Sequence, residues 1–311
     1  MPRLYFASDI HGSDICWKKF LGAASFYKAD VLVLGGDMTG KAIVPLVDDG
    51  KTVRAALLGS SYELESEKAM QDFEKQVRSR GYYPVRMDRA ERDSYAADPA
   101  ALDGRFRKAV LDTLATWLDM AADRLPAGVP CFVCPGNDDP PEVDELLAAS
   151  GLIIDGEGRC HDIGGFQLAS TGWTTPTPWA TCREEPEAAL RGRLDSMLEG
   201  FSDFSRFIFN VHCPPYGTGL DEAPELGADL SIQNAGQSTI PVGSTAVRDA
   251  VKHYQPLVSL HGHIHESKGV ARIGKTLAVN PGSLYEQGVL QGVLLELDSR
   301  KGLKHYVLTT G

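Results

Sequence analysis

Residues 261–265 read His-Gly-His-Ile-His, and this stretch constrains the chain more than any other. Three of the eight histidines stand here, directly after the apolar run 256–260, which reads as a buried strand. In extended backbone, side chains two residues apart point the same way, so His263 and His265 are able to face one ion or one ion pair. The carboxyl end of a strand is also where open α/β sheets place their ligands. The stretch therefore predicts a metal site at a sheet edge; the alternative is an exposed polar turn with chance histidines.

Four more apolar runs end in side chains that bind metals. These are Asp9 and His11 after 4–8, Asp37 after 31–34, Asn137 and Asp138 after 129–134, and His212 after 207–211. Strands joined by helices run parallel, so their carboxyl ends meet at one edge of a sheet. Each motif alone is weak, and Asp37 is equally well placed to cap the next helix. All five in order predict a single polar cluster.

The alternation of strands and helices breaks between about residues 41 and 128. Strands near 43–47 and 52–58 flank a glycine-containing turn, which indicates a hairpin. Helical patterns follow at about 65–80 and from the N-cap Asp98 to about Arg124. We predict one domain over residues 1–311, interrupted by an insertion of a hairpin and two helices that forms a cap or a dimer contact.

Beyond residue 268, four strand-like runs lie near 269–273, 276–279, 289–297 and 303–308. We expect them to pair antiparallel and to close a second sheet. Earlier, the loop 171–179 is too irregular and aromatic for a plain connector. It either lines a substrate pocket or packs Trp173 and Trp179 on the core. Trp173 and Tyr216, which stands four residues after His212, are two of the three candidate substrate-binding side chains, and Asn137 is the third.

Charge and composition limit the partners. A net charge of −11 disfavours long nucleic acids, which bind basic surfaces, but says little about a small phosphoester, because bound metals would dominate the local field. No apolar run approaches the roughly 20 residues that span a bilayer. Since the chain passes from its first three residues straight into a strand-like run, we expect a cytoplasmic protein. Cys131 and Cys134 fall on opposite faces of one strand, so we expect buried thiols rather than a zinc or redox pair.

The ordered motifs Asp-x-His, Gly-Asp, Gly-Asn-Asp, His and Gly-His-x-His resemble those of the calcineurin-like metallophosphoesterases. The resemblance runs from Leu4 to about Leu297, apart from the insertion, and the segment 280–283, Asn-Pro-Gly-Ser, is similar to one common in small prokaryotic members. It implies an α/β (α+β) fold, namely a four-layer α/β/β/α sandwich of two mixed sheets.

The resemblance also implies two divalent ions, Mn, Fe, Zn or Ni, at the edge of the sheets. Carried over by position, the ligands are Asp9, His11 and His265 for the first ion, Asn137, His212 and His263 for the second, and Asp37 as the bridge. The ions would clamp the oxygens of an in-line displacement, with a bridging hydroxide as nucleophile. Asn137, Asp138 and His212 would be the catalytic residues, and Asn137 would also bind the substrate by donating an amide hydrogen bond to a phosphate oxygen. His161, His253, His261 and His305 match no motif, and we expect structural roles for them.

One position departs from the family pattern. Many members have His after Gly-Asn, where this chain has Asp138. An aspartate beside two cations is ionised at pH 7, so it is a poor acid and repels a phosphate dianion. We therefore predict a preference for diesters or for esters with acidic leaving alcohols. The rival interpretations are a catalytically silent scaffold or binding module of this fold, and a nuclease of the same family.

Overall fold

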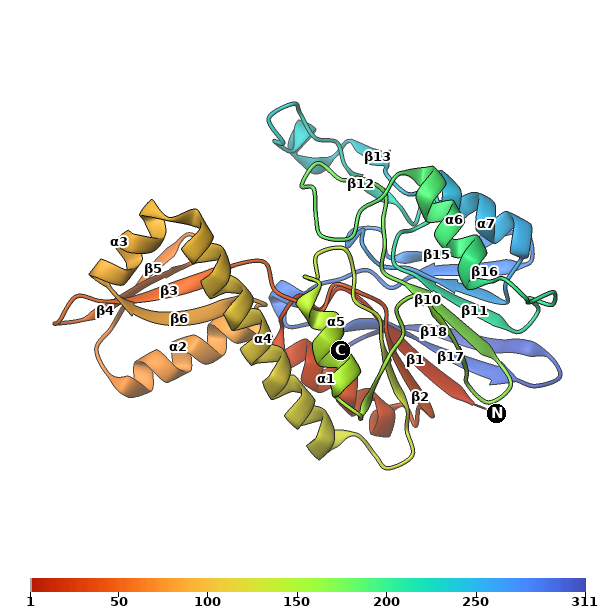
Figure 1. Cartoon of the computed structure of the whole chain (residues 1–311), viewed down its shortest axis with the longest axis horizontal. Helices are drawn as coiled ribbons and strands as arrows, with labels where there is room; N and C mark the ends of the chain where they lie inside the picture. Colours follow the sequence, from red (N-terminus) through yellow and green to blue (C-terminus); the bar gives the residue numbers. More distant parts are fainter. Residues whose placement is uncertain (1) are drawn as a thin grey trace.

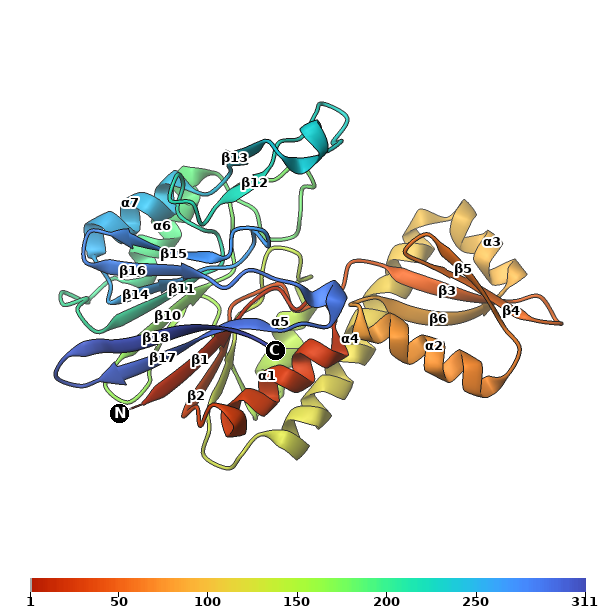
Figure 2. The same cartoon turned by 180° about the vertical axis from the view of Figure 1, so that it is seen from behind.

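The computed structural model describes residues 2–311, and two mixed sheets pack face to face in it between two layers of helices (Figure 1, Figure 2). The first sheet contains β1 (Arg3–Ala7), β2 (Val31–Leu34), β7 (Cys131–Val133), β8 (Ile153–Asp155), β17 (Gln291–Asp298) and β18 (Gly302–Thr310). Its strand order is β18-β17-β1-β2-β7-β8, parallel from β1 to β8 and antiparallel at β17 and β18.

The second sheet is formed by β10 (Gln167–Thr171), β11 (Phe207–Val211), β14 (Val258–Leu260), β15 (Gly269–Ile273) and β16 (Thr276–Asn280). Its order is β10-β11-β14-β16-β15, with only the edge strand β15 antiparallel among these five. A short strand, β9 (Arg159–Asp162), runs beside β10.

The continuous apolar runs of the sequence arise because both faces of these strands are covered. In β1, Leu4 and Phe6 point into the core between the sheets, whereas Tyr5 and Ala7 point towards the helices. The outer face of the first sheet is covered by α1 (Asp14–Phe26), α4 (Pro99–Arg124) and α5 (Glu142–Ala149), and that of the second by α6 (Glu187–Met197) and α7 (Thr245–Tyr254). The predicted α/β/β/α sandwich is confirmed.

The insertion differs from the expected hairpin and two helices. Its elements are β3 (Ile43–Asp48), β4 (Val53–Leu57), β5 (Ser60–Leu64), α2 (Glu67–Ser79), β6 (Tyr83–Asp88) and α3 (Arg89–Ala97). The hairpin β3–β4 is present, but β5 and β6 extend it to a four-stranded sheet of order β5-β4-β3-β6. The sequence does not predict β6, because Pro84 and Arg86 interrupt its strand pattern; β6 is an edge strand, where proline is tolerated. It does not predict α3, because this helix has no buried residue and therefore no periodic apolar pattern. We call residues 43–97 the inserted lobe; it projects from the sandwich in Figure 1.

The long helix α4 connects the inserted lobe to the sandwich. Near its amino end it contacts α3 and β6, and its carboxyl half packs on α1. The rings of Trp17 and Trp117 stack at 5.1 Å, and the Trp17 indole donates to the Trp117 carbonyl oxygen at 3.0 Å. The second predicted helix of the insertion therefore belongs in large part to the sandwich.

The carboxyl-terminal strands also differ from the expectation. β15 and β16 join the second sheet, but β17 pairs antiparallel with β1 in the first sheet, with Leu4 opposite Leu295. The prediction that all four runs close one second sheet is therefore wrong, because the apolar pattern of a strand does not specify which sheet it joins. The long loop 220–243 contains the small ribbon β12 (Glu222–Pro224) and β13 (Thr239–Pro241) and the turn Gln233–Gly236. Across residues 2–311, no helix combines the length and the apolar character that a membrane crossing requires.

Candidate metal centre

The carboxyl ends of β1, β2, β7, β11 and β14 meet at one edge of the sandwich. All seven predicted ligands lie there: Asp9, His11, Asp37, Asn137, His212, His263 and His265. The ligand atoms of Asp9, His11 and His265 lie within 4.8 Å of one another, and so do those of Asp37, His212 and His263. A third set, His11, Asp37 and Asp138, also has its ligand atoms within 4.8 Å of one another, so the side chains of the predicted ligands form one continuous cluster.

The first group is a tight triangle. Nε2 of His11 lies 3.0 Å from Nε2 of His265, and the latter lies 3.4 Å from Oδ1 of Asp9. The backbone N–H of His263 donates to the same Asp9 oxygen at 2.9 Å, which fixes the carboxylate. Three donor atoms therefore converge on one point.

The second group, Asp37, His212 and His263, meets the first group at Asp37. Oδ2 of Asp37 lies 3.2 Å from Nε2 of His212 and 3.7 Å from Nε2 of His11, which belongs to the first group. Nδ1 of His263 lies 2.8 Å from Oδ1 of Asn137. Asp37 is therefore the carboxylate that lies between the two groups.

The burial of the acidic and imidazole side chains indicates whether the cluster could hold cations. Asp9 and Asp37 are each 2% exposed, and their ion-pair partners among residues 2–311 are histidines only. Nδ1 of His212 is buried without a hydrogen-bond partner among residues 2–311, and Nε2, although 3.2 Å from Oδ2 of Asp37, makes no hydrogen bond of good geometry. Burying paired carboxylates and unbonded nitrogens is costly unless a positive charge compensates. The carboxylate and imidazole donors suit divalent transition metals.

The protonation states favour ligation by two of the histidines. Burial lowers the pKa of His11 to about 3 and that of His263 to about 4, so both rings are neutral at pH 7. Burial alone would raise the pKa of Asp37 and lower that of His212, but their pairing reverses both effects. It holds the pKa of Asp37 well below its usual range and raises the pKa of His212 to about 9. A cation that binds His212 at pH 7 therefore has to displace a proton.

The backbone at the ligands is held in an uncommon conformation. Asp9, His11, Asp37 and His263 have φ values of 56°, 38°, 48° and 69°, in the left-handed region. Such residues cost about 1–3 kcal/mol each and cluster at functional sites. The conformation is held by backbone hydrogen bonds, including His11 N–H to the Asp37 carbonyl at 3.0 Å.

Close packing explains why glycine precedes two of the ligands. A Cβ at Gly36 would lie 2.3 Å from Nδ1 of His212, and a Cβ at Gly262 would lie 2.3 Å from Oδ2 of Asp9. Real Cβ atoms do not approach this closely, so only glycine lets the ligand loops of the two sheets meet. The Gly-Asp and Gly-His motifs are therefore required by the convergence of strand ends.

Several residues at the site were not selected from the sequence. Asp139 accepts hydrogen bonds from the backbone N–H groups of Thr39 at 2.8 Å and Gly136 at 2.7 Å, which ties the loops after β2 and β7 together. The hydroxyl of Ser283 donates to the Asp9 carbonyl at 2.6 Å, and the Asn280 amide donates to the Ile264 carbonyl at 2.9 Å. The Asn-Pro-Gly-Ser segment, noted only as a resemblance, thus supports the loops of both metal groups.

Asp138 lies at the rim of the cluster. Its N–H donates to Oδ1 of Asp37 at 3.0 Å, and its Oδ2 lies 3.8 Å from Nδ1 of His11. Burial and then the nearby Asp37 raise the pKa of Asp138 to about 6, so it is mostly ionised at pH 7. Oδ2 of Asp138 also lies 3.2 Å from Nζ of Lys41, a residue that no sequence motif marked.

The substrate-binding candidates Trp173 and Tyr216 each lie beside an arginine side chain. Trp173 is half-buried against the core between the second sheet and its helices, with the Arg193 guanidinium 4.1 Å above its ring. This favours the packing alternative for Trp173, whereas Trp179 is 63% exposed. Tyr216 is 38% exposed, and Arg248 lies 5.8 Å from its ring centre. Its assignment to the substrate stays a prediction.

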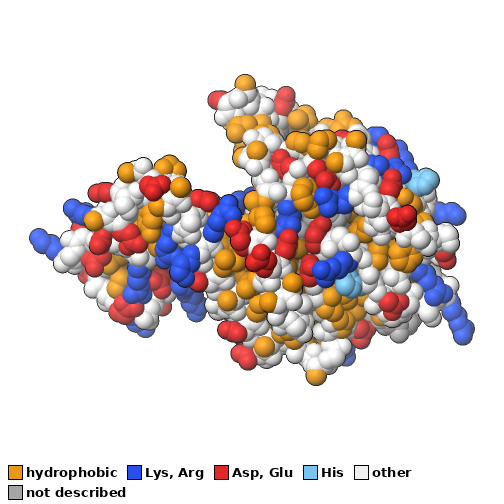
Figure 3. All heavy atoms as spheres, viewed as in Figure 1, with side chains coloured by type: hydrophobic (Ala, Val, Ile, Leu, Met, Phe, Trp, Pro, Cys, Tyr) orange, Lys and Arg blue, Asp and Glu red, His pale blue; other side chains and the backbone are white. Residues whose placement is uncertain are grey.

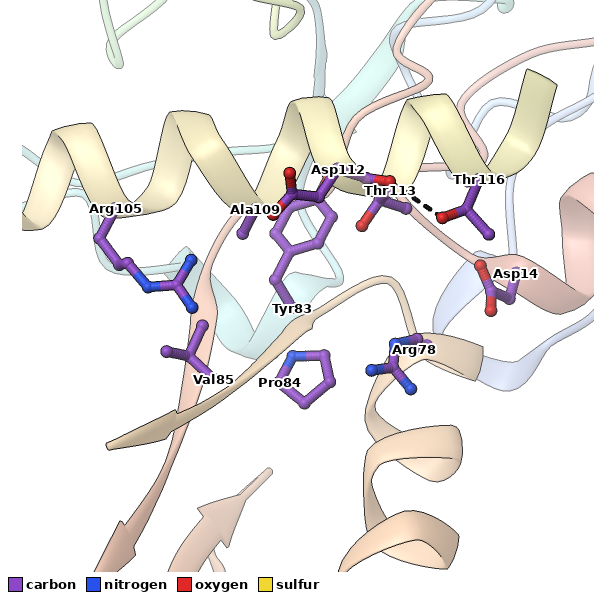
Figure 4. Close-up of a pocket in the computed structure, with 10 residues that line it drawn as sticks. All are labelled: Asp14, Arg78, Tyr83, Pro84, Val85, Arg105, Ala109, Asp112, Thr113 and Thr116. Carbon is purple, nitrogen blue, oxygen red and sulfur yellow. Dashed lines mark hydrogen bonds between the residues drawn. The ribbon is translucent and has the colours of Figure 1, made fainter. Parts of the chain in front are cut away.

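A separate cavity of about 200 Å³ lies between α4, β6 and the start of α1 (Figure 4). Arg105 and Arg78 lie on either side of Tyr83 and Pro84, Asp14 lies beyond Arg78, and the ring of Tyr83 lies against α4. Among the described residues that line this cavity, none is a predicted ligand. The cavity is a feature of the junction between the lobe and the sandwich, not of the metal cluster.

Comparisons with known proteins support the fold. No family model matches the chain. An uncharacterized protein of Methanocaldococcus jannaschii, MJ1162, is 31% identical over 150 residues, a match that spans 47% of this chain and 61% of that protein. The crystal structure of TT1561 of Thermus thermophilus is similar at a TM-score of 0.53 and 18% identity, over 100% of this chain and 98% of that one. Another solved structure has a TM-score of 0.58 and 18% identity, over 99% of each chain.

These similarities concern the fold alone. The structure has two mixed sheets between layers of helices, and the side chains of the five motifs gather at one edge of them. The chain therefore shares the fold of these two solved structures, and its architecture agrees with the fold implied by the sequence resemblance to the calcineurin-like metallophosphoesterases.

Proposed function

We propose that this protein is a dinuclear, metal-dependent phosphoesterase. The observation that carries the proposal is the convergence of two ligand groups, Asp9/His11/His265 and Asp37/His212/His263, that meet at Asp37. Two divalent cations held there would lower the pKa of a shared water and neutralise charge on a phosphoryl group. The single carboxylate between the groups is the feature that a site for one ion would not need.

The protein's own residues would orient these parts. Asn137 presents Oδ1 to His263, while its amide N–H donates to the Thr181 hydroxyl at 2.9 Å and to Asp138 at 3.2 Å. The amide is therefore oriented as a ligand through oxygen, and its N–H group is already engaged. This weakens the idea that Asn137 donates to a phosphate oxygen.

The direct test is a screen of metal-reconstituted protein. Protein loaded with Mn, Fe, Zn or Ni would be assayed on phosphomonoesters, phosphodiesters and cyclic nucleotides, together with the measured metal content. We expect hydrolysis that depends on about two bound ions per chain. Turnover that is unaffected when all metal is stripped would refute the proposal.

A catalytically silent scaffold is the rival from another class. Replacing Asp37 with Ala removes the carboxylate that joins the two groups, so a phosphoesterase should lose activity by about 10³-fold or more. A scaffold would keep its binding partner. The neutral Asp37→Asn variant, which keeps the shape of the side chain, serves as a check that the loss is not due to misfolding.

A small phosphoester or nucleotide is the proposed substrate class. The net charge of −11 opposes long nucleic acids, and acidic and basic side chains are interspersed over the face shown in Figure 3. A nuclease activity is therefore the second candidate within the enzyme class. A cytoplasmic location and a homo-oligomer formed through the insertion stay predictions.

Asp138 determines the proposed leaving-group preference. Because it is mostly ionised at pH 7 and lies at the rim of the ligand cluster, it supplies little acid to a leaving alkoxide. We expect p-nitrophenyl esters to react much faster than alkyl phosphates. Equal rates on the two would contradict this role of Asp138.

A further inference from the structure

Lys41 is the cation nearest to the ligand cluster that the proposed mechanism does not yet use. Its Nζ lies 3.2 Å from Oδ2 of Asp138, and the same oxygen lies 3.8 Å from Nδ1 of His11. The Lys41 side chain is 49% exposed and that of Asp138 is 20% exposed. Only the Asp138 side chain therefore lies between the Lys41 ammonium group and the predicted ligand His11, and the exposed lysine can be reached by a molecule from solvent.

The charge around Lys41 holds it at the rim. Burial alone would lower its pKa, but Asp138, Asp37 and Asp9 raise it, so the side chain is a stable cation at neutral pH. An ammonium group has three N–H donors, and the contact with Asp138 uses one of them. The remaining donors are available to an anionic ligand.

The backbone around Lys41 is fixed by the inserted lobe. The N–H of the preceding residue, Gly40, donates to the Tyr83 hydroxyl at 2.6 Å. A Cβ at Gly40 would lie 2.1 Å from the Gly81 carbonyl oxygen, so the two segments are in close contact. Tyr83 is itself 2% exposed and belongs to the main helical core. The lobe and the sandwich together determine where Lys41 stands.

From this arrangement we propose that Lys41 binds a phosphoryl oxygen of the substrate, and that Asp138 positions the lysine for that contact. This rests on the proposed phosphoesterase function and names the part of the site that recognises the phosphate. It resolves the difficulty that a carboxylate at position 138 repels a phosphate dianion, because the adjacent ammonium offsets that charge and offers donors in its place. The proposal also gives the inserted lobe a function, because its residues Gly81 and Tyr83 contact Gly40 and so position Lys41.

The test compares Lys41→Met, which removes the charge at similar length, with Lys41→Arg, which keeps the charge. Lys108→Met is the matched control, because Lys108 is also an exposed, ion-paired lysine, with Asp112 2.8 Å away on α4. Each protein would be loaded with Mn, its metal content measured, and its Kd for inorganic phosphate determined by titration. The kcat and KM for a p-nitrophenyl diester would be measured in parallel.

We expect Lys41→Met to weaken phosphate binding by about tenfold or more and to raise KM more than it lowers kcat. Metal content should be unchanged, Lys41→Arg should retain most of the phosphate affinity, and Lys108→Met should match the wild type. Equal phosphate Kd values for Lys41→Met and the wild type would overturn the inference. So would a wild-type protein that binds no phosphate when loaded with metal.

A double variant separates direct binding from mere charge balance. If Lys41 only neutralised Asp138, then Lys41→Met combined with Asp138→Asn would restore wild-type phosphate affinity, and the inference would be wrong. If the lysine contacts the phosphate, the double variant stays weak. Phosphate binding that depends on Lys41 in a protein without hydrolytic activity would support this inference while refuting the proposed function, so the two failures are distinguishable.

Discussion

The sandwich and the inserted lobe use sheets of opposite character. In the sandwich, β2, β11 and β16 are buried at every residue because helices or the other sheet cover both faces. In the lobe, β4 and β6 alternate between buried and more exposed positions. The buried part of the lobe core has seven side chains: Val44, Leu46, Ala55, Leu57, Leu64, Phe73 and Val77. The sandwich is a frame whose central strands are covered on both faces, and the lobe is a small unit with its own core.

This difference accounts for the placement of the site. Ligands must be held to within a fraction of an ångström, so they are best carried by strand ends that are packed on both sides. All seven predicted ligands come from the sandwich, and the lobe approaches the site through Gly81 and Tyr83, which pack against the backbone of His11 and of Gly40. The following experiments test this separation, from the largest expected effect to the smallest.

Removal of the cations should affect the sandwich edge alone. Chelation is expected to lower phosphoester turnover by about 10³-fold or more, and adding Mn back should restore it. Helix content should change little, because the core between the sheets contains no ligand. Circular dichroism and turnover measured on the same samples check both statements. Widespread loss of helix on chelation would show that the metals hold the fold together.

Matched cavities should distinguish the two cores. Phe6 lies between the sheets and Phe73 lies in the lobe core, and both are almost fully buried. Replacing either with Ala should cost about 3–5 kcal/mol, but for Phe73→Ala the loss should be confined to local unfolding of residues 43–97. Hydrogen exchange would report it. If Phe73→Ala lowered the protection of β1 and β2 equally, the two regions would be one cooperative unit.

Metal affinity should depend on pH at the sandwich edge. Because Asp37 raises the pKa of His212 to about 9, a cation must displace a proton from this ring below that pH. The apparent affinity should therefore rise by about tenfold per pH unit between pH 6 and 8 and level off near pH 9. Titrations in metal buffers at three pH values measure this slope. An affinity that does not change with pH would exclude His212 as a ligand.

The smallest effect is expected at the surface of the lobe. Arg86 pairs with Glu67 at 2.7 Å and with Glu74 at 2.6 Å, but its side chain is 43% exposed. Arg86→Ala should lower the stability of the lobe by at most about 1 kcal/mol, and salt should reduce the difference. Exchange rates of residues 43–97 at low and high ionic strength would measure it. A change in metal affinity would contradict the separation of the two regions.

The sequence alone determined the sandwich and the polar side chains that gather at its edge. A strand buried on both faces must be apolar throughout, and its end must be marked by residues of a different kind, so Asp9, Asp37 and His212 stood out. The spacing of two in Asp9-x-His11 and His263-x-His265 gave further local signals. Because these features lie within a few consecutive residues, they are readable without the tertiary structure.

Only the tertiary structure decided the pairings between distant segments. Nothing local distinguishes β17, which returns to β1, from β16, which stays in the second sheet, because both are apolar. The same holds for β6, whose pairing with β3 overrides a weak strand pattern, and for α3, which has no buried face. The role of Lys41 could not be predicted for the same reason. Lys41 and Asp138 are 97 positions apart in the sequence, and a single charged residue forms no sequence pattern that would indicate their contact.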